Sequence, residues 1–257
     1  MYPVLFKWGG LTVYTYGSIL TLGLLTGGIL VLIGTKKKGI SIERVIELFF
    51  CGILSFIFGS RALYVLANAS LFWEDPLRIV KIWEGGMSFY GGMVLATGVS
   101  FGYARWYNLP VWKLADLFSP SFALGLFFAR TGCFFAGCCY GKETILPWGI
   151  TFTNPMSLAR LNVSLHPTQL YEAGGCFGLF LFLIWMDKRK TFNGQIFWLF
   201  SLLYSVIRFF IEMLRGDPRG FLFGSLLSIS QAIAVFSIIV SLFMMSYLSR
   251  REREYEI

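Results

Sequence analysis

Long apolar runs, separated by short polar segments, occupy most of this 257-residue chain. Several runs approach the roughly 20 apolar residues that an α-helix needs to cross a bilayer. We therefore expect seven membrane-spanning helices, at Leu11–Gly34, Val45–Ala67, Phe89–Trp106, Leu117–Phe135, Tyr171–Met186, Ile196–Leu214 and Phe223–Tyr247. The third and fifth are short. The pattern predicts an all-α integral membrane protein with a single transmembrane domain over residues 1–257.

The composition supports this class. Hydrophobic residues make up 56% of the chain and charged residues only 14%, whereas soluble domains carry about 25% charged residues. The formal net charge is +8, but the basic residues gather in four segments that follow alternate helices, so they do not indicate nucleic-acid binding. These segments hold Lys36, Lys37 and Lys38; Arg105 and Lys113; Lys188, Arg189 and Lys190; and Arg250, Arg251 and Arg253.

The basic segments also predict an orientation in the membrane. They all fall on one side if seven helices cross in turn, and the positive-inside rule makes that side cytoplasmic. We expect the N-terminus outside and the C-terminus in the cytoplasm. The first helix is expected to be retained, because its lysines follow the apolar core, whereas a signal peptide carries positive charge before it. Residues 142–165, between the fourth and fifth helices, are long enough for a small extracytoplasmic cap.

Ionisable residues inside the apolar runs indicate function, because a charge at the bilayer centre costs roughly 2.5–3.5 kcal/mol on insertion scales. Tyr204, Arg208 and Glu212 are spaced four apart in the sixth predicted helix, so they share one face. Arg130 lies in the fourth predicted helix. A local Arg–Glu pair that packs helices is the simpler alternative for Arg208. Two arginines facing one interior predict an anion pocket, and lipid phosphate is the anion at hand; Arg suits phosphate through its planar fork.

Glycines and cysteines surround Arg130 in the sequence ARTGCFFAGCCYG, which ends at Gly141. The glycines allow the helix to break where a cavity or protein covers the backbone. Arg61, near the outer end of the second helix, is expected to extend to the headgroups.

The cysteines Cys133, Cys138 and Cys139 leave three alternatives open. They are a disulfide with an undetermined partner, a reactive thiolate beside Arg130, and a zinc site, which the spacing favours least. We favour a structural or redox role over a nucleophile.

Two further segments carry candidate residues. Glycines flank Ser88 and Tyr90 in WEGGMSFYGG at Trp83–Gly92, where the Tyr90 phenol points either to the headgroups or to a cavity. His166 is the only histidine and precedes a predicted helix start in HPTQLYE. A lone histidine in this position is more often structural than catalytic.

These segments together resemble the prolipoprotein diacylglyceryl transferase family of bacterial inner-membrane enzymes. The resemblance runs from Tyr16 to about Gln231 in matching order. It rests on Tyr16-Gly17, GSRALYVL, WEGGMSFYGG, Asp116 to Pro120, ARTGCFFAGCCYG, HPTQLYE and LLYSVIRFFIEMLRGDP. The resemblance implies seven transmembrane helices, an outer N-terminus and a periplasmic head.

The resemblance also implies an activity. The family transfers a diacylglyceryl group from phosphatidylglycerol to the thiol of a lipoprotein signal-sequence cysteine, releases glycerol phosphate, and uses no metal or organic cofactor. Its essential arginines match Arg130 and Arg208. Its functional tyrosines, glutamate and signature glycine match Tyr16, Tyr204, Glu212 and Gly141.

The chain departs from the family pattern on the side of the acceptor. The family has His where this chain has Tyr90, and Asn and Glu where it has Cys133 and Cys138. A phenol with a pKa near 10 is a poor base at neutral pH. We expect Arg130, Arg208, Glu212, Tyr90 and Cys138 to be catalytic. The residues expected to bind substrate are Tyr16, Ser88, Cys133, Gly141, His166 and Tyr204.

The leading hypothesis is therefore an inner-membrane transferase that acts on phosphatidylglycerol and on a lipoprotein precursor or a related acceptor. The first alternative is a membrane thiol oxidoreductase that cycles Cys133 with Cys138 or Cys139. The second is a protein that binds phospholipid without turnover. A transporter is disfavoured because the sequence shows no duplicated halves.

Overall fold

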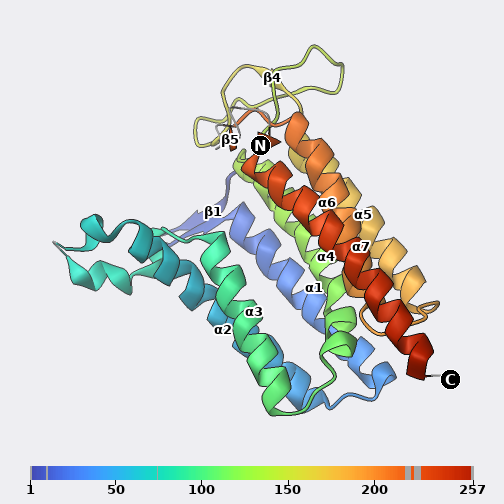
Figure 1. Cartoon of the computed structure of the whole chain (residues 1–257). Helices are drawn as coiled ribbons and strands as arrows, with labels where there is room; N and C mark the ends of the chain where they lie inside the picture. The colour runs from blue at the N-terminus through green and yellow to red at the C-terminus, as the bar shows by residue number, and fades with distance from the viewer. Residues whose placement is uncertain (1, 10, 74, 218–220, 223–226, 256–257) are drawn as a thin grey trace. The chain divides into compact units, whose positions relative to one another are not determined.

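The computed structural model describes the chain except residues 1, 10, 74, 218–220, 223–226 and 256–257 (Figure 1). The backbone divides into two compact units. One unit comprises Met1–Val31 and Ala115–Ile257, and the other comprises Leu32–Leu114. The chain is mainly helical, and the expected single transmembrane domain stays a prediction.

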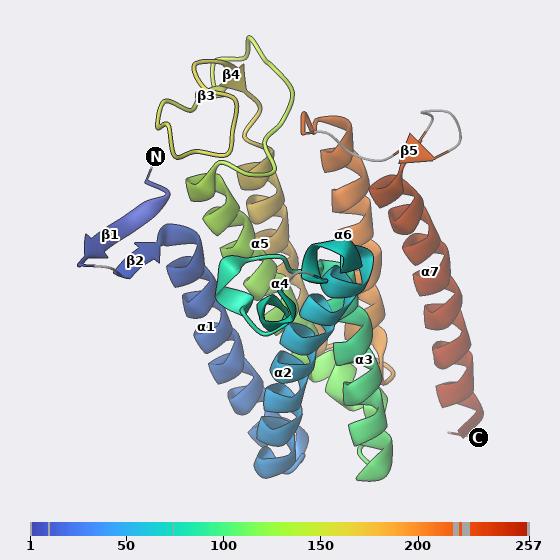
Figure 2. The same ribbon diagram turned by 90° about the vertical axis from the view of Figure 1, so that its left-hand side faces the viewer.

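The first unit contains α1 up to Val31, α4 from Ala115, and all of α5, α6 and α7. The bounds of these helices are Thr15–Lys38, Val111–Ala136, Thr168–Asp187, Gln195–Met213 and Ile229–Tyr255. A buried cluster of Ala123, Leu179, Leu183 and Ile196 joins α4, α5 and α6. These three helices lie side by side in both ribbon views (Figure 2).

The second unit is built on α2 (Ile42–Ala67) and α3 (Phe89–Trp106). Their contact depends on two glycines. A Cβ added to Gly59 would lie 2.4 Å from the carbonyl oxygen of Gly91, and a Cβ on Gly91 would lie 2.3 Å from that of Gly59. The two backbones therefore approach as closely as small residues permit in membrane helices. Three short 3-10 helices, Ala69–Phe72, Pro76–Ile79 and Ile82–Glu84, connect them.

Arg61 differs from the sequence expectation. Its side chain is buried rather than extended to the headgroups. The guanidinium donates to the carbonyl oxygens of Ile79 at 2.9 Å, Gly85 at 2.6 Å and Gly86 at 2.9 Å, and also to that of Arg78. Arg61 therefore organises the connection between α2 and α3, because its N–H donors satisfy carbonyls that the irregular backbone leaves unpaired.

The N-terminal apolar run forms a hairpin before it forms a helix. Strand β1 (Val4–Trp8) pairs antiparallel with β2 (Leu11–Tyr14), and α1 begins only at Thr15. The predicted helix start at Leu11 was therefore wrong. The prediction failed because Leu11–Tyr14 has the two-residue periodicity of a strand and pairs with the strand formed by the preceding residues.

The other strands are short and lie in loops. Strands β3 (Ile150–Thr151) and β4 (Ser164–Leu165) pair within residues 142–165, which we call the cap. Strands β5 (Phe221–Leu222) and β6 (Leu227–Ser228) pair before α7. The predicted start of the last helix, Phe223, lies outside the described residues, and α7 begins at Ile229.

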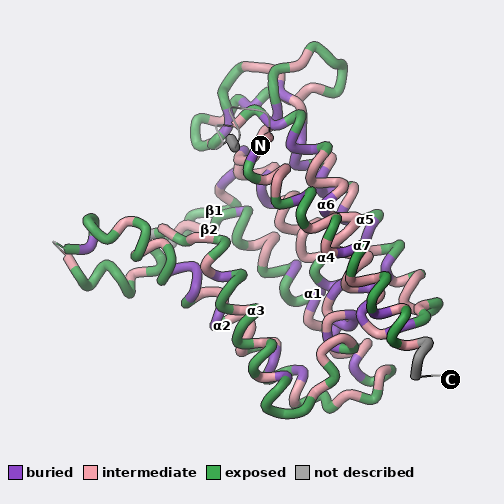
Figure 3. The backbone as a smooth tube through the Cα atoms, in the orientation of Figure 1, coloured by how far each residue is buried: buried purple, intermediate pink, exposed green. Residues whose placement is uncertain are grey.

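Six of the seven helices in the described residues are long and apolar enough to cross a membrane. The remaining one is α3, whose bounds the sequence predicted correctly at both ends. Many large apolar side chains on the helices stay exposed. Exposed residues recur along the helices in the backbone tube coloured by burial (Figure 3). Phe236 and Phe243 on α7 are 68% and 66% exposed. A soluble surface rarely carries such contiguous apolar area, so these faces suit lipid.

One buried carboxylate fixes the start of α6. Asp116 is fully buried and accepts hydrogen bonds from the backbone N–H groups of Gly194 at 2.9 Å and Phe197 at 3.1 Å. Lys190 pairs with the same carboxylate at 2.9 Å. The negative charge therefore lies at the positive end of the α6 dipole, and α6, which carries Arg208, is held against α4.

Candidate active site

Glu172 is the centre of a buried ionic cluster in the first unit. It lies in the second turn of α5 and is fully buried. Its Oε2 atom is 3.1 Å from Nε of Arg130 and 3.3 Å from Nη1 of Arg208. The Arg130 contact is an ion pair rather than an aligned hydrogen bond. Guanidinium groups from two separate helices, α4 and α6, therefore converge on one carboxylate oxygen.

A second carboxylate completes the coordination of Arg208. Its Nη2 atom pairs with Oε2 of Glu212 at 2.8 Å, one turn along α6. Glu212 in turn accepts a hydrogen bond from the Ser228 hydroxyl at 3.0 Å. Two fixed oxygens on separate helices hold the guanidinium plane of Arg208 in one orientation.

Tyr204 contacts the same carboxylate as the two arginines. Its hydroxyl donates to Oε1 of Glu172 at 3.0 Å. The ring stacks on Phe200 with centroids 5.9 Å apart. Tyr204 therefore fixes the carboxylate that both arginines share, and its phenol also interacts electrostatically with Arg130.

The cluster lies close to one end of the helices that build it. Arg130 is six residues before the end of α4, Glu172 four residues after the start of α5, and Arg208 five residues before the end of α6. At 1.5 Å per residue these positions lie roughly 6–9 Å inside the helix ends. The side chains of Arg130 and Arg208 remain 18% and 13% exposed. Guanidinium N–H groups therefore remain available for a ligand.

Gly141 lets three chain segments meet above this cluster. Its N–H donates to the His166 carbonyl at 3.0 Å, and the next N–H, of Lys142, donates to the Leu214 carbonyl at 2.8 Å. A Cβ on Gly141 would lie 2.5 Å from Cβ of His166 and 2.9 Å from the Leu214 oxygen. Any larger residue would separate the segments that follow α4 and α6 and precede α5.

Three cysteine thiols form a cluster beside Arg130. The sulfur atoms of Cys133, Cys138 and Cys139, which we call the thiol cluster, all lie within 4.8 Å of one another. Nη1 of Arg130 is 3.7 Å from the sulfur of Cys139. The structure has all five cysteines as free thiols, so it does not contain the disulfide considered from the sequence. Arg130 therefore contacts the Glu172 carboxylate and a cysteine sulfur with the same guanidinium.

The cysteines beyond the end of α4 differ in acidity. The pKa of Cys139 lies below its ordinary value because the neighbouring thiols of Cys133 and Cys138 form hydrogen bonds with it, and because Arg215 and Arg130 are close. The hydrogen bond with Cys133 raises the pKa of Cys138, and so does burial. Of the two cysteines that follow α4, Cys139 is therefore the more acidic, and Arg215 and Arg130 are the cations near it.

Tyr16 packs beside the thiol cluster. A Cβ on Gly132 would lie 3.0 Å from the Tyr16 ring, so α1 and α4 are in contact there. The phenol is within electrostatic range of Cys133, Cys138 and Arg130. The expected part of Tyr16 in substrate binding stays a prediction.

His166 belongs to a separate polar group at the cap. Its Nδ1 atom lies 3.4 Å from the Tyr171 hydroxyl, which accepts a hydrogen bond from the Trp148 indole at 2.8 Å. Its backbone carbonyl accepts the hydrogen bond from the Gly141 N–H described above. Among the described residues, neither of these side-chain contacts involves Arg130 or Arg208. The expected part of His166 in substrate binding stays a prediction.

Ser88 and Tyr90 lie in the second unit. Ser88 precedes the first residue of α3, and its N–H donates to the Ser60 carbonyl at 2.9 Å. Tyr90 is half-exposed and makes an edge contact with Phe89. Their expected part in catalysis or binding stays a prediction.

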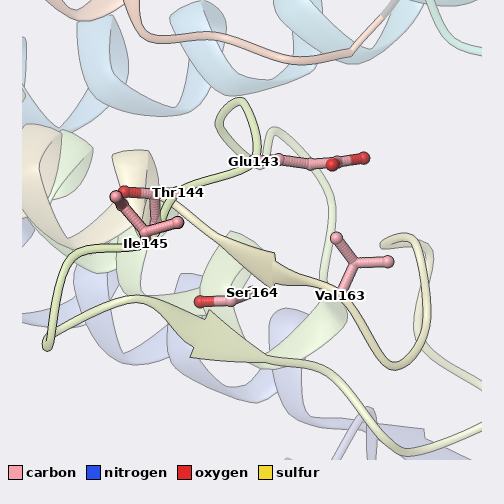
Figure 4. A pocket seen from close by; sticks show the side chains of 5 residues that line it. All are labelled: Glu143, Thr144, Ile145, Val163 and Ser164. Atoms are coloured by element: carbon pink, nitrogen blue, oxygen red, sulfur yellow. The ribbon is translucent and has the colours of Figure 1, made fainter.

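A shallow pocket on the cap is unrelated to these groups (Figure 4). It is lined by Glu143, Thr144, Ile145, Val163 and Ser164. None of the residues predicted to act on substrate lines it, so we do not assign it to the active site.

Comparison with known proteins places this chain in a family. The family model described as prolipoprotein diacylglyceryl transferase matches residues 3–247. The chain belongs to this family. A relative from Clostridium tetani, named phosphatidylglycerol–prolipoprotein diacylglyceryl transferase, is 40% identical over 243 residues, covering 95% of this chain and 96% of the relative. Relatives from Clostridium perfringens and Geobacter sulfurreducens are 35% and 33% identical over 236 and 259 residues. They cover 90% and 97% of this chain, and 89% and 96% of their own lengths.

The transferase family resemblance and the charge pattern both missed Glu172 as a site residue. We interpreted HPTQLYE as the start of a helix, so Glu172, its last residue, was not considered as a site residue. The signal was present, because a carboxylate within an apolar helix is itself an intramembrane charge. Arg215, just beyond the end of α6, is also buried and forms a two-point pair with Asp217, at 2.8 Å for each contact.

Proposed function

We propose that this protein transfers the diacylglyceryl group of phosphatidylglycerol to the thiol of a cysteine in a lipoprotein precursor and releases glycerol phosphate. The convergence of Arg130 and Arg208 on Glu172 carries the proposal. Membership of the family and the names of its relatives support the reaction and the substrates. They favour it over an oxidoreductase or a lipid-binding protein without turnover.

The two arginines suit the phosphodiester. Each guanidinium offers five N–H donors, and the carboxylates of Glu172 and Glu212 use only some of those on Arg130 and Arg208. The remaining donors are held in place by these anchors before any ligand arrives. Such preorganised donors stabilise charge that develops in a transition state more than the same groups in water.

The reaction places its largest charge change on the phosphate. The acceptor sulfur attacks the diacylglyceryl carbon that is bonded to a phosphate oxygen. A carbon–sulfur bond forms, the carbon–oxygen bond breaks, and its electron pair leaves with glycerol phosphate. The proton of the thiol is lost to a base or to water. A phosphodiester with one negative charge becomes a phosphomonoester with greater charge, and Arg130 and Arg208 are placed to stabilise it.

The membrane placement is part of the same proposal. We propose seven spans, with α3 as the one shorter crossing, an outer N-terminus, and the cap on the extracytoplasmic side of a bacterial inner membrane. The basic residues at the cytoplasmic ends support this orientation through the positive-inside rule. The ionic cluster then lies roughly 6–9 Å inside the outer helix ends, at a depth that lipid headgroups reach from the side.

The experiment uses the purified full-length protein in vesicles of phosphatidylglycerol, with a peptide that carries a lipoprotein signal-sequence cysteine. We expect glycerol phosphate in equal amount to peptide whose mass has increased by one diacylglyceryl group. A peptide with Ser in place of Cys and vesicles of phosphatidylethanolamine serve as controls. Absence of both products with the cysteine peptide, under conditions where the protein stays folded, contradicts the proposal.

A further inference from the structure

We propose that Cys133, Cys138 and Cys139 bind one thiophilic divalent cation of the zinc type, and that the fourth position on this ion receives the acceptor thiol. This inference rests on the proposed function for the role of the ion, but the binding site itself stands on the geometry of the thiol cluster. The resemblance implies no metal, but the family has Asn and Glu where this chain has Cys133 and Cys138. The spacing of the cysteines also gave little support to zinc, because it lacks the paired pattern of common structural sites.

The fold brings the three cysteines together, although their spacing in the sequence does not predict it. Cys133 lies in the last turn of α4, and Cys138 and Cys139 follow the end of that helix. The chain reverses between them, with positive φ angles of 78° at Gly137 and 62° at Cys139. A Cβ on Gly137 would lie 2.0 Å from the Ser157 hydroxyl and 3.1 Å from the Ala159 nitrogen. Only glycine permits this turn, which folds the later thiols back over the earlier one.

The distances between the sulfurs suit a metal ion. Thiolates bound tetrahedrally at a Zn–S distance of about 2.3 Å lie roughly 3.8 Å apart. The three sulfurs lie within 4.8 Å of one another, so a closure of about 1 Å by side-chain rotation would complete the site. A disulfide would use only two of the three sulfurs. The number of thiols and their mutual distances therefore favour coordination.

Buried side chains hold the backbone of this site. The Thr168 hydroxyl donates to the Cys139 carbonyl at 2.9 Å, and the Gln169 amide donates to the Cys138 carbonyl at 2.8 Å. Thr168 and Gln169 open α5 and are almost fully buried. Partners that fix the first ligands in this way are typical of metal sites, whose affinity depends on them.

The local charge fits an anionic metal–thiolate group. Three thiolates and one divalent cation carry a formal charge of −1, and a fourth thiolate makes it −2. Arg130 lies 3.7 Å from the Cys139 sulfur, and Arg215 is the other cation that acts on it. Both arginines remain charged at any physiological pH. They offset the negative charge that would otherwise oppose binding of the acceptor.

A fourth ligand position on the ion would explain how the acceptor becomes a nucleophile. Catalytic zinc sites keep three protein ligands and one position for water or substrate, and a thiol that binds such an ion loses its proton. The proton passes to water, and the bound sulfur attacks the diacylglyceryl carbon as described above. The product is a neutral thioether, a weaker ligand that leaves the ion. No electron transfer occurs, because zinc keeps its oxidation state.

Arg130 links this site to the lipid site. Its guanidinium contacts Glu172 through Nε and faces the Cys139 sulfur through Nη1. A phosphodiester on Arg130 and a thiolate on the ion would therefore lie on either side of one side chain. Such proximity converts the encounter of two substrates into a step between neighbouring bound groups.

The test measures binding of Zn²⁺ and Cd²⁺ to the purified full-length protein under reducing conditions, without phospholipid substrate. We expect one ion per chain by elemental analysis and a cadmium–thiolate absorption band. Each of Cys133→Ser, Cys138→Ser and Cys139→Ser should weaken binding at least tenfold, the effect typical of altered metal ligands and their partners. Cys176→Ser is the matched control, because Cys176 is also buried but lies outside the cluster.

The acceptor peptide provides the second arm. Added to the cadmium-loaded protein, the cysteine peptide should raise the thiolate band by about one third, as three sulfur ligands become four, and the serine peptide should not. The proposal is overturned if the wild-type protein shows no stoichiometric binding, or if a disulfide forms within the thiol cluster in place of the metal site. It is also overturned if the cysteine peptide leaves the cadmium–thiolate band unchanged. Full glycerol phosphate release after chelation removes the metal step but leaves the proposed function intact. Metal binding without transfer to any peptide contradicts the proposed function instead.

Discussion

Oε2 of Glu172 lies 3.1 Å from Arg130 Nε and 3.3 Å from Arg208 Nη1. One carboxylate oxygen on α5 thus determines the separation of two guanidinium groups that come from α4 and α6. Without it, two like charges would face each other in a site from which most water is excluded. Glu172 is therefore the residue that permits the two arginines to share a ligand.

Glu172→Gln removes the charge but keeps the size of this residue. We expect turnover to fall at least 100-fold, because both guanidiniums lose their common anchor and their spacing. Breaking a buried ion pair in this way should also cost about 3–5 kcal/mol of stability. Glycerol phosphate release and thermal unfolding in detergent measure the two effects. Wild-type turnover in a folded Glu172→Gln protein would show that the shared carboxylate is not needed.

Tyr204→Phe tests the hydroxyl that orients Glu172. The ring keeps its stacking on Phe200, while the hydrogen bond to Oε1 is lost. A hydrogen bond to a charged group contributes about 1.5–3 kcal/mol, so we expect turnover to fall roughly tenfold or more. Tyr247→Phe is the control, because Tyr247 stacks on Phe243 and is half-exposed on α7. Equal activity of the two variants would exclude an orienting role for Tyr204.

The sequence predicted most helices well and the start of α1 poorly, for a physical reason. Hydropathy detects whether a segment suits lipid but not whether a nearby strand will pair with it. The run at α3 was assigned correctly because Gly85 and Gly86 set its start. Leu11–Tyr14 was assigned to a helix, although it pairs with β1.

The candidate site was predictable only in part. Arg130 and Arg208 could be found because charges are costly in apolar helices, whereas their meeting point is a property of how α4, α5 and α6 pack. The burial of Arg61 depends on the irregular carbonyls of residues 78–86, which no local pattern reveals. The thiol cluster depends on the turn at Gly137.

Gly141→Ala tests the meeting of the three segments above the arginines. Its methyl group would lie 2.5 Å from Cβ of His166 and against backbone oxygens, so the segments must move apart. Overpacking of this kind typically costs about 1–3 kcal/mol. Gly125→Ala on α4 is the matched control, because nothing lies within 4 Å of its added Cβ. Thermal unfolding should show a lower midpoint for Gly141→Ala alone, and equal midpoints would contradict the close approach.

Asp116→Asn tests the clamp at the start of α6. The substitution leaves Lys190 without its buried partner and weakens the bonds to the Gly194 and Phe197 N–H groups. We expect a loss of about 3–5 kcal/mol in stability. Glu143→Gln breaks the exposed pair with Arg160 and should cost at most about 1 kcal/mol. A loss for Asp116→Asn no greater than that for Glu143→Gln would show that the clamp does not stabilise the fold.

The central claim is that Arg130 and Arg208 act on one phosphate as a unit, and a double-mutant cycle tests it most directly. Glycerol phosphate release from phosphatidylglycerol is measured for the wild-type protein, Arg130→Ala, Arg208→Ala and the double variant, with Arg160→Ala as a control on the exposed cap. We predict that each single change lowers the rate about 1,000-fold and that the double variant is little worse than either, because residues that act together are strongly non-additive. Losses that multiply, or substantial turnover in Arg208→Ala, would contradict the account.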